Sequence, residues 1–479
     1  MIRAGLFILY EAIGLSWALG CAVCSATLFL LWWLGLPIGV AIPVALGIAG
    51  LAAALAVRLI WKSRRHSPPS LDDSRPRSYG FAGMRTRRTR TSAIPSPAHP
   101  SCARQVRVLS LLPAVGAPAL IAVVCGVAAW TAWQAPFAAW DAWSIWAFKA
   151  HAFAGGGLPL SYFHDQQTLF THPDYPLNLP LVEAVLLRLG GPAGDHLAAL
   201  PGPVSFLALL LLFYTGLARL YGAGRAAWAV AALALVPALA SQAAGGDADV
   251  PLALYAGGAA LYLALWWRRR ESADALLCAL LAGGAAWTKK EGLPVALLLI
   301  AAFTTGEVWP GTVGALWPRL RQVAAVWALA LALPLPWLLF NWRTHPIGRD
   351  FLPLTPGTLL AHLDRLPEIA RFFGLLMLSF QHWSLLWVVL AAVLVLRRRN
   401  LTGRGGALLV LLAPQLAVYA LAFVFSDWQP YTDHIRTSLD RLLVQAVPLA
   451  VLVLSEVACA GKQEPAAAHE PPAELPLAG

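Results

Sequence analysis

Acidic side chains stand out where two of the apolar segments of this chain end. The first is Asp141, which follows an apolar segment within the stretch Trp140-Asp141-Ala142-Trp143-Ser144-Ile145-Trp146. Tryptophans at positions i, i+3 and i+6 form one stripe on a helix, and such stripes are typical of an aromatic belt at a membrane surface. A belt does not explain the acid, because a carboxylate at the apolar boundary is costly without a role. We therefore interpret Asp141 as a catalytic residue and Trp143 as a substrate contact beside it.

The second acidic place is the segment Gly245-Gly246-Asp247-Ala248-Asp249-Val250-Pro251, between two apolar segments. Two acids one residue apart can hold a divalent cation through oxygen ligands, or they can orient a sugar. The alternative is a solvated loop whose aspartate caps the helix that starts before Pro251. The residues leave these readings open. A divalent cation is accordingly an option, but no cofactor is certain and no metal site is assigned.

Two basic residues, Lys289 and Arg441, occur at the ends of later apolar segments, in Thr288-Lys289-Lys290-Glu291 and Asp440-Arg441. The topology derived below puts both at the outer face, against the usual bias of Lys and Arg toward the cytoplasm. An anionic ligand would explain them, and snorkelling to lipid headgroups is the alternative. His172 and Tyr175 lie in a proline-flanked stretch that predicts an extended turn. We expect both to contact substrate.

Taken together, these residues suit the transfer of a sugar from a lipid phosphate to an acceptor hydroxyl. A phosphate is already a good leaving group, so it needs neutralisation by cations rather than a strong acid. The acceptor hydroxyl is a poor nucleophile until a carboxylate accepts its proton. One base and a pair of cations therefore suffice for a single inverting displacement.

The composition indicates the elements that must position these residues. Of 479 residues, 59% are hydrophobic and 12% are charged, about half the charged share of a soluble domain. Apolar segments of about 17–25 residues recur, which is the length of a membrane-spanning helix. We predict an all-α polytopic membrane protein with about 12 transmembrane helices. A short half-helix at 177–190 and amphipathic helices in the first outer loop complete the expected fold.

The net charge of +11 arises largely from short clusters of Lys and Arg between the apolar segments. This is the pattern of cytoplasmic loops, so we expect no nucleic-acid partner. The polar stretch 62–107 is predicted to be a disordered basic cytoplasmic linker between a two-helix hairpin, 1–61, and a transmembrane core, 108–458. Outer loops are expected at 133–178 and 342–371, and a disordered cytoplasmic tail at 459–479. The polar groups then face the outer, periplasmic side of the plasma (inner) membrane.

At these residues the sequence resembles the glycosyltransferase C superfamily, in particular the branch of protein O-mannosyltransferases and lipid A aminoarabinose transferases. The likeness covers about 107–458 and follows the family's motif order, with matches at Asp141, Tyr175-Pro176-Leu177, Leu200-Pro201-Gly202-Pro203, Ala248-Asp249-Val250-Pro251, Thr288-Lys289 and Arg441-Leu442-Leu443. The resemblance implies a polyprenyl-phosphate sugar donor bound from the lipid bilayer and a lipid, glycan or protein acceptor outside. It also implies that Asp141 is the general base and Asp249 a second acid.

The main rival hypothesis is a transporter or flippase of a lipid-linked saccharide. Transporters place ionisable groups near the middle of the membrane on broken helices. Here the expected spans are nearly free of charge at their centres, Glu11 and Glu183 being the main exceptions. The sequence therefore favours an enzyme over a transporter.

Overall fold

The computed structural model describes residues 2–65, 116–308, 316–348, 350–401 and 403–459. Within these ranges the regular structure is helical, apart from one isolated β-bridge between Phe351 and Ser426. The predicted all-α membrane architecture is confirmed. The predicted linker and tail lie almost entirely outside the described residues.

Within the described ranges, seven helices are long and apolar enough to cross a membrane. They are α1 (Ile2–Trp33), α2 (Ile38–Arg65), α4 (Ala117–Gln134), α8 (Pro201–Tyr221), α11 (Asp249–Arg269), α20 (Arg404–Val424) and α21 (Tyr431–Cys459). Two further helix pairs qualify as broken spans: α9 (Ala223–Ala234) with α10 (Pro237–Gly245), bent by 62°, and α14 (Leu316–Ala332) with α15 (Leu335–Thr344), bent by 60°. Each break has a proline beside it, Pro237 and Pro334, since proline cannot donate the helical hydrogen bond.

The count of seven, or nine with the bent pairs, is lower than the twelve that we expected. Two of the missing spans are the helices α12 (Ser272–Thr288) and α13 (Gly292–Val308), of 17 residues each. At 1.5 Å per residue such a helix is about 26 Å long, slightly short of a full span. A third expected span, 372–396, is divided into α17 (Leu366–Met377), α18 (Phe380–Trp383) and α19 (Leu386–Leu396).

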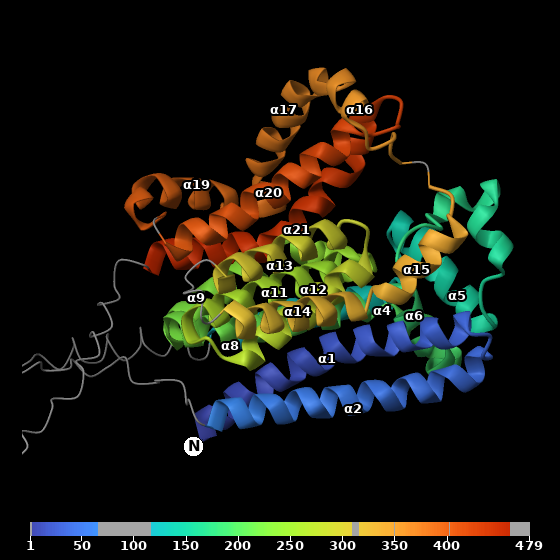
Figure 1. Cartoon of the computed structure of the whole chain (residues 1–479), viewed down its shortest axis with the longest axis horizontal. Coiled ribbons are helices and arrows are strands. Elements are labelled where there is room, and N and C mark those ends of the chain that lie inside the picture. Colours follow the sequence, from blue (N-terminus) through green and yellow to red (C-terminus); the bar gives the residue numbers. More distant parts are fainter. Residues whose placement is uncertain (1, 66–115, 309–315, 349, 402, 460–479) are drawn as a thin grey trace, which may run out of the picture.

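The segments after α4 form short helices at one end of the bundle (Figure 1). A π-helical turn, Ala142–Ala147, runs directly into α5 (Phe148–Gly155), and two 3-10 turns follow at Leu160–His164 and Gln166–Thr171. The half-helix expected at 177–190 is present as α6 (Asn178–Gly190), which is only 13 residues long. The short α7 (Gly194–Ala198) leads from there into α8.

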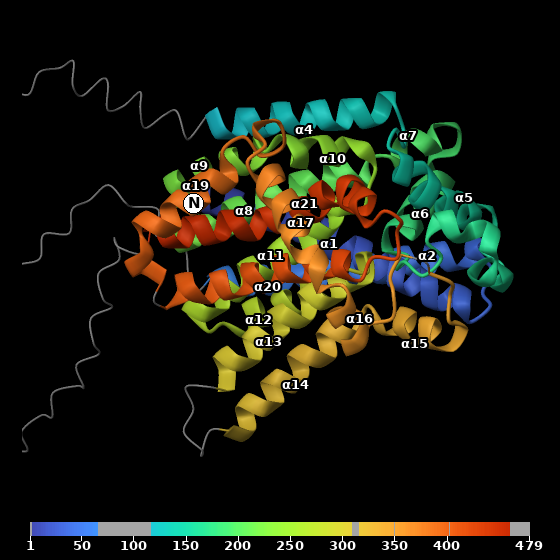
Figure 2. The ribbon, with the colours of Figure 1, turned by 90° about the horizontal axis from the view of Figure 1, so that it is seen from above.

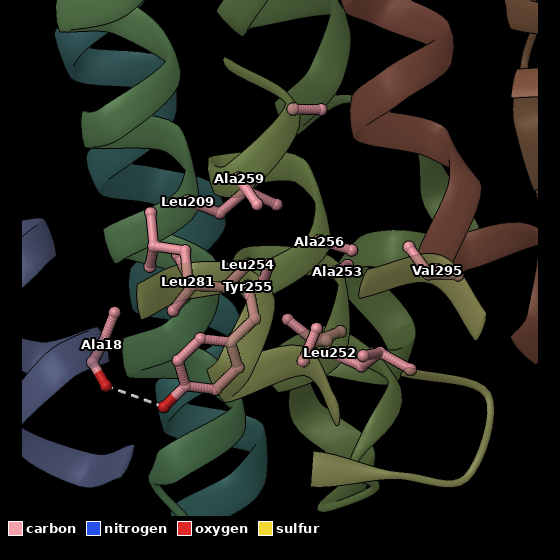
Figure 3. Packing of buried hydrophobic residues seen from close by; sticks show 14 of the residues in the cluster. Ala18, Leu209, Leu252, Ala253, Leu254, Tyr255, Ala256, Ala259, Leu281 and Val295 are labelled. Carbon is pink, nitrogen blue, oxygen red and sulfur yellow. Dashed lines mark hydrogen bonds between the residues drawn. The ribbon is translucent and has the colours of Figure 1, made fainter. Parts of the chain in front are cut away.

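Helix α11 lies at the centre of the bundle and packs against α8, α12 and α21 (Figures 1 and 2). In its apolar window 94% of the residues are buried, so its side chains pack against protein nearly all round. A Cβ at Gly257 would lie 2.4 Å from Pro448, so only glycine lets α11 and α21 approach this closely. The Tyr255 hydroxyl donates a 2.7 Å hydrogen bond to the Ala18 carbonyl and ties α11 to α1 (Figure 3).

Candidate functional site

A cavity of about 720 Å³ lies between the first turns of α21, the end of α10 and the loops around them. It brings together residues far apart in the sequence. Six of the eight residues that we singled out line it: Asp141, His172, Tyr175, Asp247, Lys289 and Arg441. The other two do not belong to the lining: Asp249 lies next to it, bonded to Lys289, and Trp143 packs edge-on against Trp140 with 46% of its surface exposed.

Arg441 and Asp141 form an ion pair in the wall of the cavity, although they are 300 residues apart in the chain. Asp141 immediately precedes the π-helical turn, and Arg441 lies about three turns into α21. Their side chains are 23% and 18% exposed, so the pair is accessible from the cavity. The Nε of Arg441 is buried without a hydrogen-bond partner. The guanidinium therefore keeps donor capacity beyond its bond to Asp141.

Lys289 and Asp249 form a second pair, which is almost fully buried. The Lys289 ammonium donates to Oδ1 of Asp249 at 2.8 Å, and the Gln445 amide donates to the same oxygen at 2.6 Å. Burial disfavours the charged form of Lys289, but Asp249 and Glu291 outweigh it, so its pKa lies above the usual value. Oδ2 of Asp249 has no partner. This pair is held in place by several helices, whereas the first pair faces open space.

Asp247 lies on the loop between α10 and α11, which turns at Gly246 with φ of 85°. Its side chain is 4% exposed, and Oδ1 has no hydrogen-bond partner. Burial and the neighbouring Asp249 raise the pKa of Asp247 to about 7. Asp247 thus lines the cavity without an ion pair to either Arg441 or Lys289, whose partners are other carboxylates.

The loop that carries His172 and Tyr175 is fixed by charged residues that the sequence reasoning missed. Nδ1 of His172 lies 2.9 Å from Oδ2 of Asp350, and the Lys149 ammonium donates to the His172 carbonyl at 2.8 Å. Burial lowers the pKa of Lys149 to about 7. Burial alone would raise the pKa of Asp350, but the hydrogen bond from His172 outweighs it and lowers the pKa to about 2.

Tyr175 packs between His172 and Lys290. Its ring lies 4.6 Å from the His172 ring, and the Lys290 ammonium sits 4.8 Å from its centroid. Lys290 in turn pairs with Asp174. Part of the sequence pattern could have indicated Asp350 and Lys290. Asp350 lies in the predicted second outer loop, and Lys290 is next to Lys289. Lys149 gave no such signal, because nothing in its neighbourhood shows that its side chain is buried.

The sequence left a divalent cation as an option. Among the described residues, no group of three or more His, Cys, Asp or Glu side chains is arranged to hold a metal ion. Asp249, one of the two acids that suggested a cation, is instead bonded to Lys289 and Gln445.

Comparisons with known proteins give little beyond the geometry. No family model matches the chain, and no curated protein matches it. Among solved structures, the chain is similar to the crystal structure of the Archaeoglobus fulgidus oligosaccharyltransferase in complex with Zn and sulfate, with 14% sequence identity and a TM-score of 0.41. The similarity covers 70% of this chain and 48% of that one, so the chain spans about half the length of that protein. A likeness of this degree carries no functional conclusion, and the function is inferred below from the cavity and the motifs.

Proposed function

We propose that the protein is a membrane glycosyltransferase. It moves a sugar from a polyprenyl-phosphate-linked donor to an acceptor hydroxyl, carried by a lipid, a glycan or a protein, at the outer face of the plasma membrane. The observation that carries this proposal is the Arg441–Asp141 pair in the wall of a 720 Å³ cavity. A cation for the phosphate and a carboxylate for the hydroxyl proton stand side by side there, and that pairing suits the proposed reaction.

The proposed reaction is a single displacement. The donor phosphate binds Arg441 and draws it away from Asp141, which frees the carboxylate as general base. The acceptor oxygen attacks the anomeric carbon and gives its proton to Asp141. The bond from that carbon to the phosphate oxygen breaks, its electron pair stays on the phosphate, and the configuration inverts. Lys289 adds positive charge nearby, and Asp249, the proposed second acid, holds Lys289 in place.

An apolar groove beside the cavity supports a lipid-linked donor. The groove has a volume of about 490 Å³ and lies between α4 and α10, where it is lined by Val123, Val127, Thr131, Ala240 and Ala244 among others. Ala138 lines the groove and Ala139 lines the cavity, so the two spaces are adjacent. Val123 and Val127 are each about 60% exposed, as suits residues that face lipid chains.

The rival hypothesis, a flippase, requires a polar path through the bundle. Between the cavity at Arg441 and the charged cluster at Glu456, α21 presents fully buried apolar side chains such as Val447 and Leu452. This packing favours an enzyme that works at one face.

The deciding experiment uses the full-length purified protein in proteoliposomes with radiolabelled polyprenyl-phosphate hexose and pentose donors. We expect release of the sugar from the lipid phosphate, and its transfer when a hydroxyl acceptor is supplied. Movement of intact donor between leaflets without sugar release would contradict the proposal and favour the flippase. Inactivity toward both donors, with a folded protein, would also count against it.

A further inference from the structure

Asp247 differs in its bonding from Asp141 and Asp249, the two aspartates that act on it electrostatically. Asp141 is paired with Arg441, and Asp249 accepts hydrogen bonds from Lys289 and Gln445. Only 4% of Asp247 is exposed, and its Oδ1 has no partner. A buried carboxylate without a donor is costly, because it loses its water and gains nothing in return. A protonated carboxyl group avoids most of that cost.

Charged residues from five elements surround Asp247. Together they do not favour its ionised form. Asp249 stands at the start of α11 and Asp141 before the π-helical turn, and both oppose ionisation of Asp247. Glu183 on α6 is 1% exposed, interacts electrostatically with Asp247 and also has an oxygen without a partner. The cations Arg441 on α21 and Lys289 beyond α12 favour ionisation, but each is already bonded to another carboxylate.

We propose that Asp247 acts as a neutral carboxylic acid that donates a hydrogen bond to the phosphate of the bound donor. This inference rests on the proposed function and adds a ligand contact to it. A neutral acid can donate to an anionic oxygen, whereas a carboxylate would repel it. The role complements that of Asp141, which must be ionised to accept a proton. Environments that separate the protonation states of neighbouring carboxyl groups commonly mark such a division of roles.

The pKa of about 7 gives the inference a pH dependence. Below pH 7 Asp247 is mostly protonated and can donate to the phosphate. As the pH rises through 7 it ionises, so its hydrogen bond is lost and a negative charge appears in its place. Phosphate affinity should therefore fall as the pH rises, in the opposite direction to the gain expected from ionisation of a general base.

The test measures binding of polyprenyl monophosphate, without a sugar, to the detergent-purified full-length chain from pH 6 to 8.5. It compares wild type with Asp247→Asn, which keeps a hydrogen-bond donor but cannot ionise, and with Asp247→Ala, which has neither. Asp195→Asn is the matched control, since Asp195 is 59% exposed and pairs with His151 outside the cavity. The sugar-free lipid separates this test from the proposed function: pH-dependent binding without any sugar transfer would leave the contact standing while the transferase proposal fails.

At pH 6.5 we expect Asp247→Ala to weaken binding about 10–100-fold, the usual value of a hydrogen bond to a charged group. Asp247→Asn should restore most of that loss, and its Kd should rise less with pH than that of wild type, since both proteins share any effect of ionisation of the phosphate monoester, whose second pKa is about 6. Two outcomes would overturn the inference. In the first, Asp247→Asn binds the lipid as poorly as Asp247→Ala at pH 6.5, or its binding keeps the wild-type pH dependence. In the second, the wild-type protein needs a divalent cation to bind the lipid and Asp247→Asn does not. Asp247 would then be a metal ligand. If Asp247→Ala fails to fold, the pH dependence of Asp247→Asn alone still decides.

Discussion

The two ends of the helical bundle both carry ion pairs with a residue of α21, but the pairs are built differently. At one end Arg441 meets Asp141 in the cavity wall. Fifteen residues later, about 22 Å along the helix, Glu456 accepts hydrogen bonds from Arg268 and Tyr221. A similar pair, Glu11 with Arg219, joins α1 to α8 near the N-terminal end of α1. We call the Glu11 and Glu456 pairs the far-end pairs.

The difference lies in hydrogen bonds left unmade. Both oxygens of Glu456 accept from Arg268, and both oxygens of Glu11 accept from Arg219. In the cavity region, by contrast, one oxygen of Asp247 and one of Asp249 have no partner, while the Nε of the arginine is unpaired in both regions, at Arg441 and at Arg268. Carboxylates with both oxygens bonded hold helices together, whereas carboxyl oxygens without a partner beside an empty volume are available to a ligand. Burial of charge alone therefore does not locate a site in this molecule.

The largest expected effect comes from Asp141→Asn, which keeps the shape of the side chain but removes its charge. If Asp141 is the general base, turnover should fall by about 10²–10⁴, while expression and the thermal midpoint change little. Steady-state kinetics with the polyprenyl-phosphate donor measure it. Near-normal turnover in this variant would remove Asp141 from the mechanism and abolish the functional contrast between the two ends.

Glu456→Gln makes the matching change at the far end and should have the reverse signature. Loss of one partner from a buried ion pair leaves Arg268 without its counter-charge and costs about 3 kcal/mol of stability. Arg404, 3.7 Å from Glu456, loses the same counter-charge, but its side chain is partly exposed and keeps its contact with solvent. We expect a lower thermal midpoint and an unchanged turnover per folded molecule. A turnover defect as large as that of Asp141→Asn would mean that the far-end pairs are not merely structural.

Much of this contrast could be predicted from sequence because charged residues are scarce in the chain. Asp141, Lys289 and Arg441 each interrupt or end an apolar segment, so their position at one end of the bundle follows from counting spans. The structure does bring them to one cavity. Which end faces the cytoplasm stays a prediction, as do the roles of these residues in catalysis.

The partners of these residues could not be predicted, because they depend on packing between distant segments. Asp350 meets His172 across 178 residues, and no local pattern indicates that contact. The number of spans was wrong for a related reason. Hydropathy measures apolar length, but it does not register the break at Pro334 or the shortness of α12 and α13.

The N-terminal hairpin shows the same limit. Its sequence predicts two apolar helices. In the structure, however, Ser25 of α1 donates a hydrogen bond to the Asn178 side chain at 2.6 Å and accepts one from the Trp287 indole at 2.8 Å. Asn178 then donates to Thr288, the residue before Lys289. A single serine thus links α1 to the segment that carries a cation of the cavity. Nothing in the spacing of Ser25 indicates this contact.

The smallest expected effect distinguishes a phosphate ligand from a residue that only reaches for lipid headgroups. Arg441→Lys keeps the charge but replaces a planar fork, which can bind two phosphate oxygens, with a point charge. If the phosphate gains charge as the glycosidic bond breaks, the lost contact matters most in the transition state, so turnover should fall about tenfold. Lys289→Arg should keep part of its activity where space allows. For a snorkelling residue either cation would serve, and Arg441→Lys would behave as wild type. Steady-state kinetics on Arg441→Lys, Arg441→Ala and Lys289→Ala complete the comparison, and wild-type turnover in all three would put the phosphate site elsewhere.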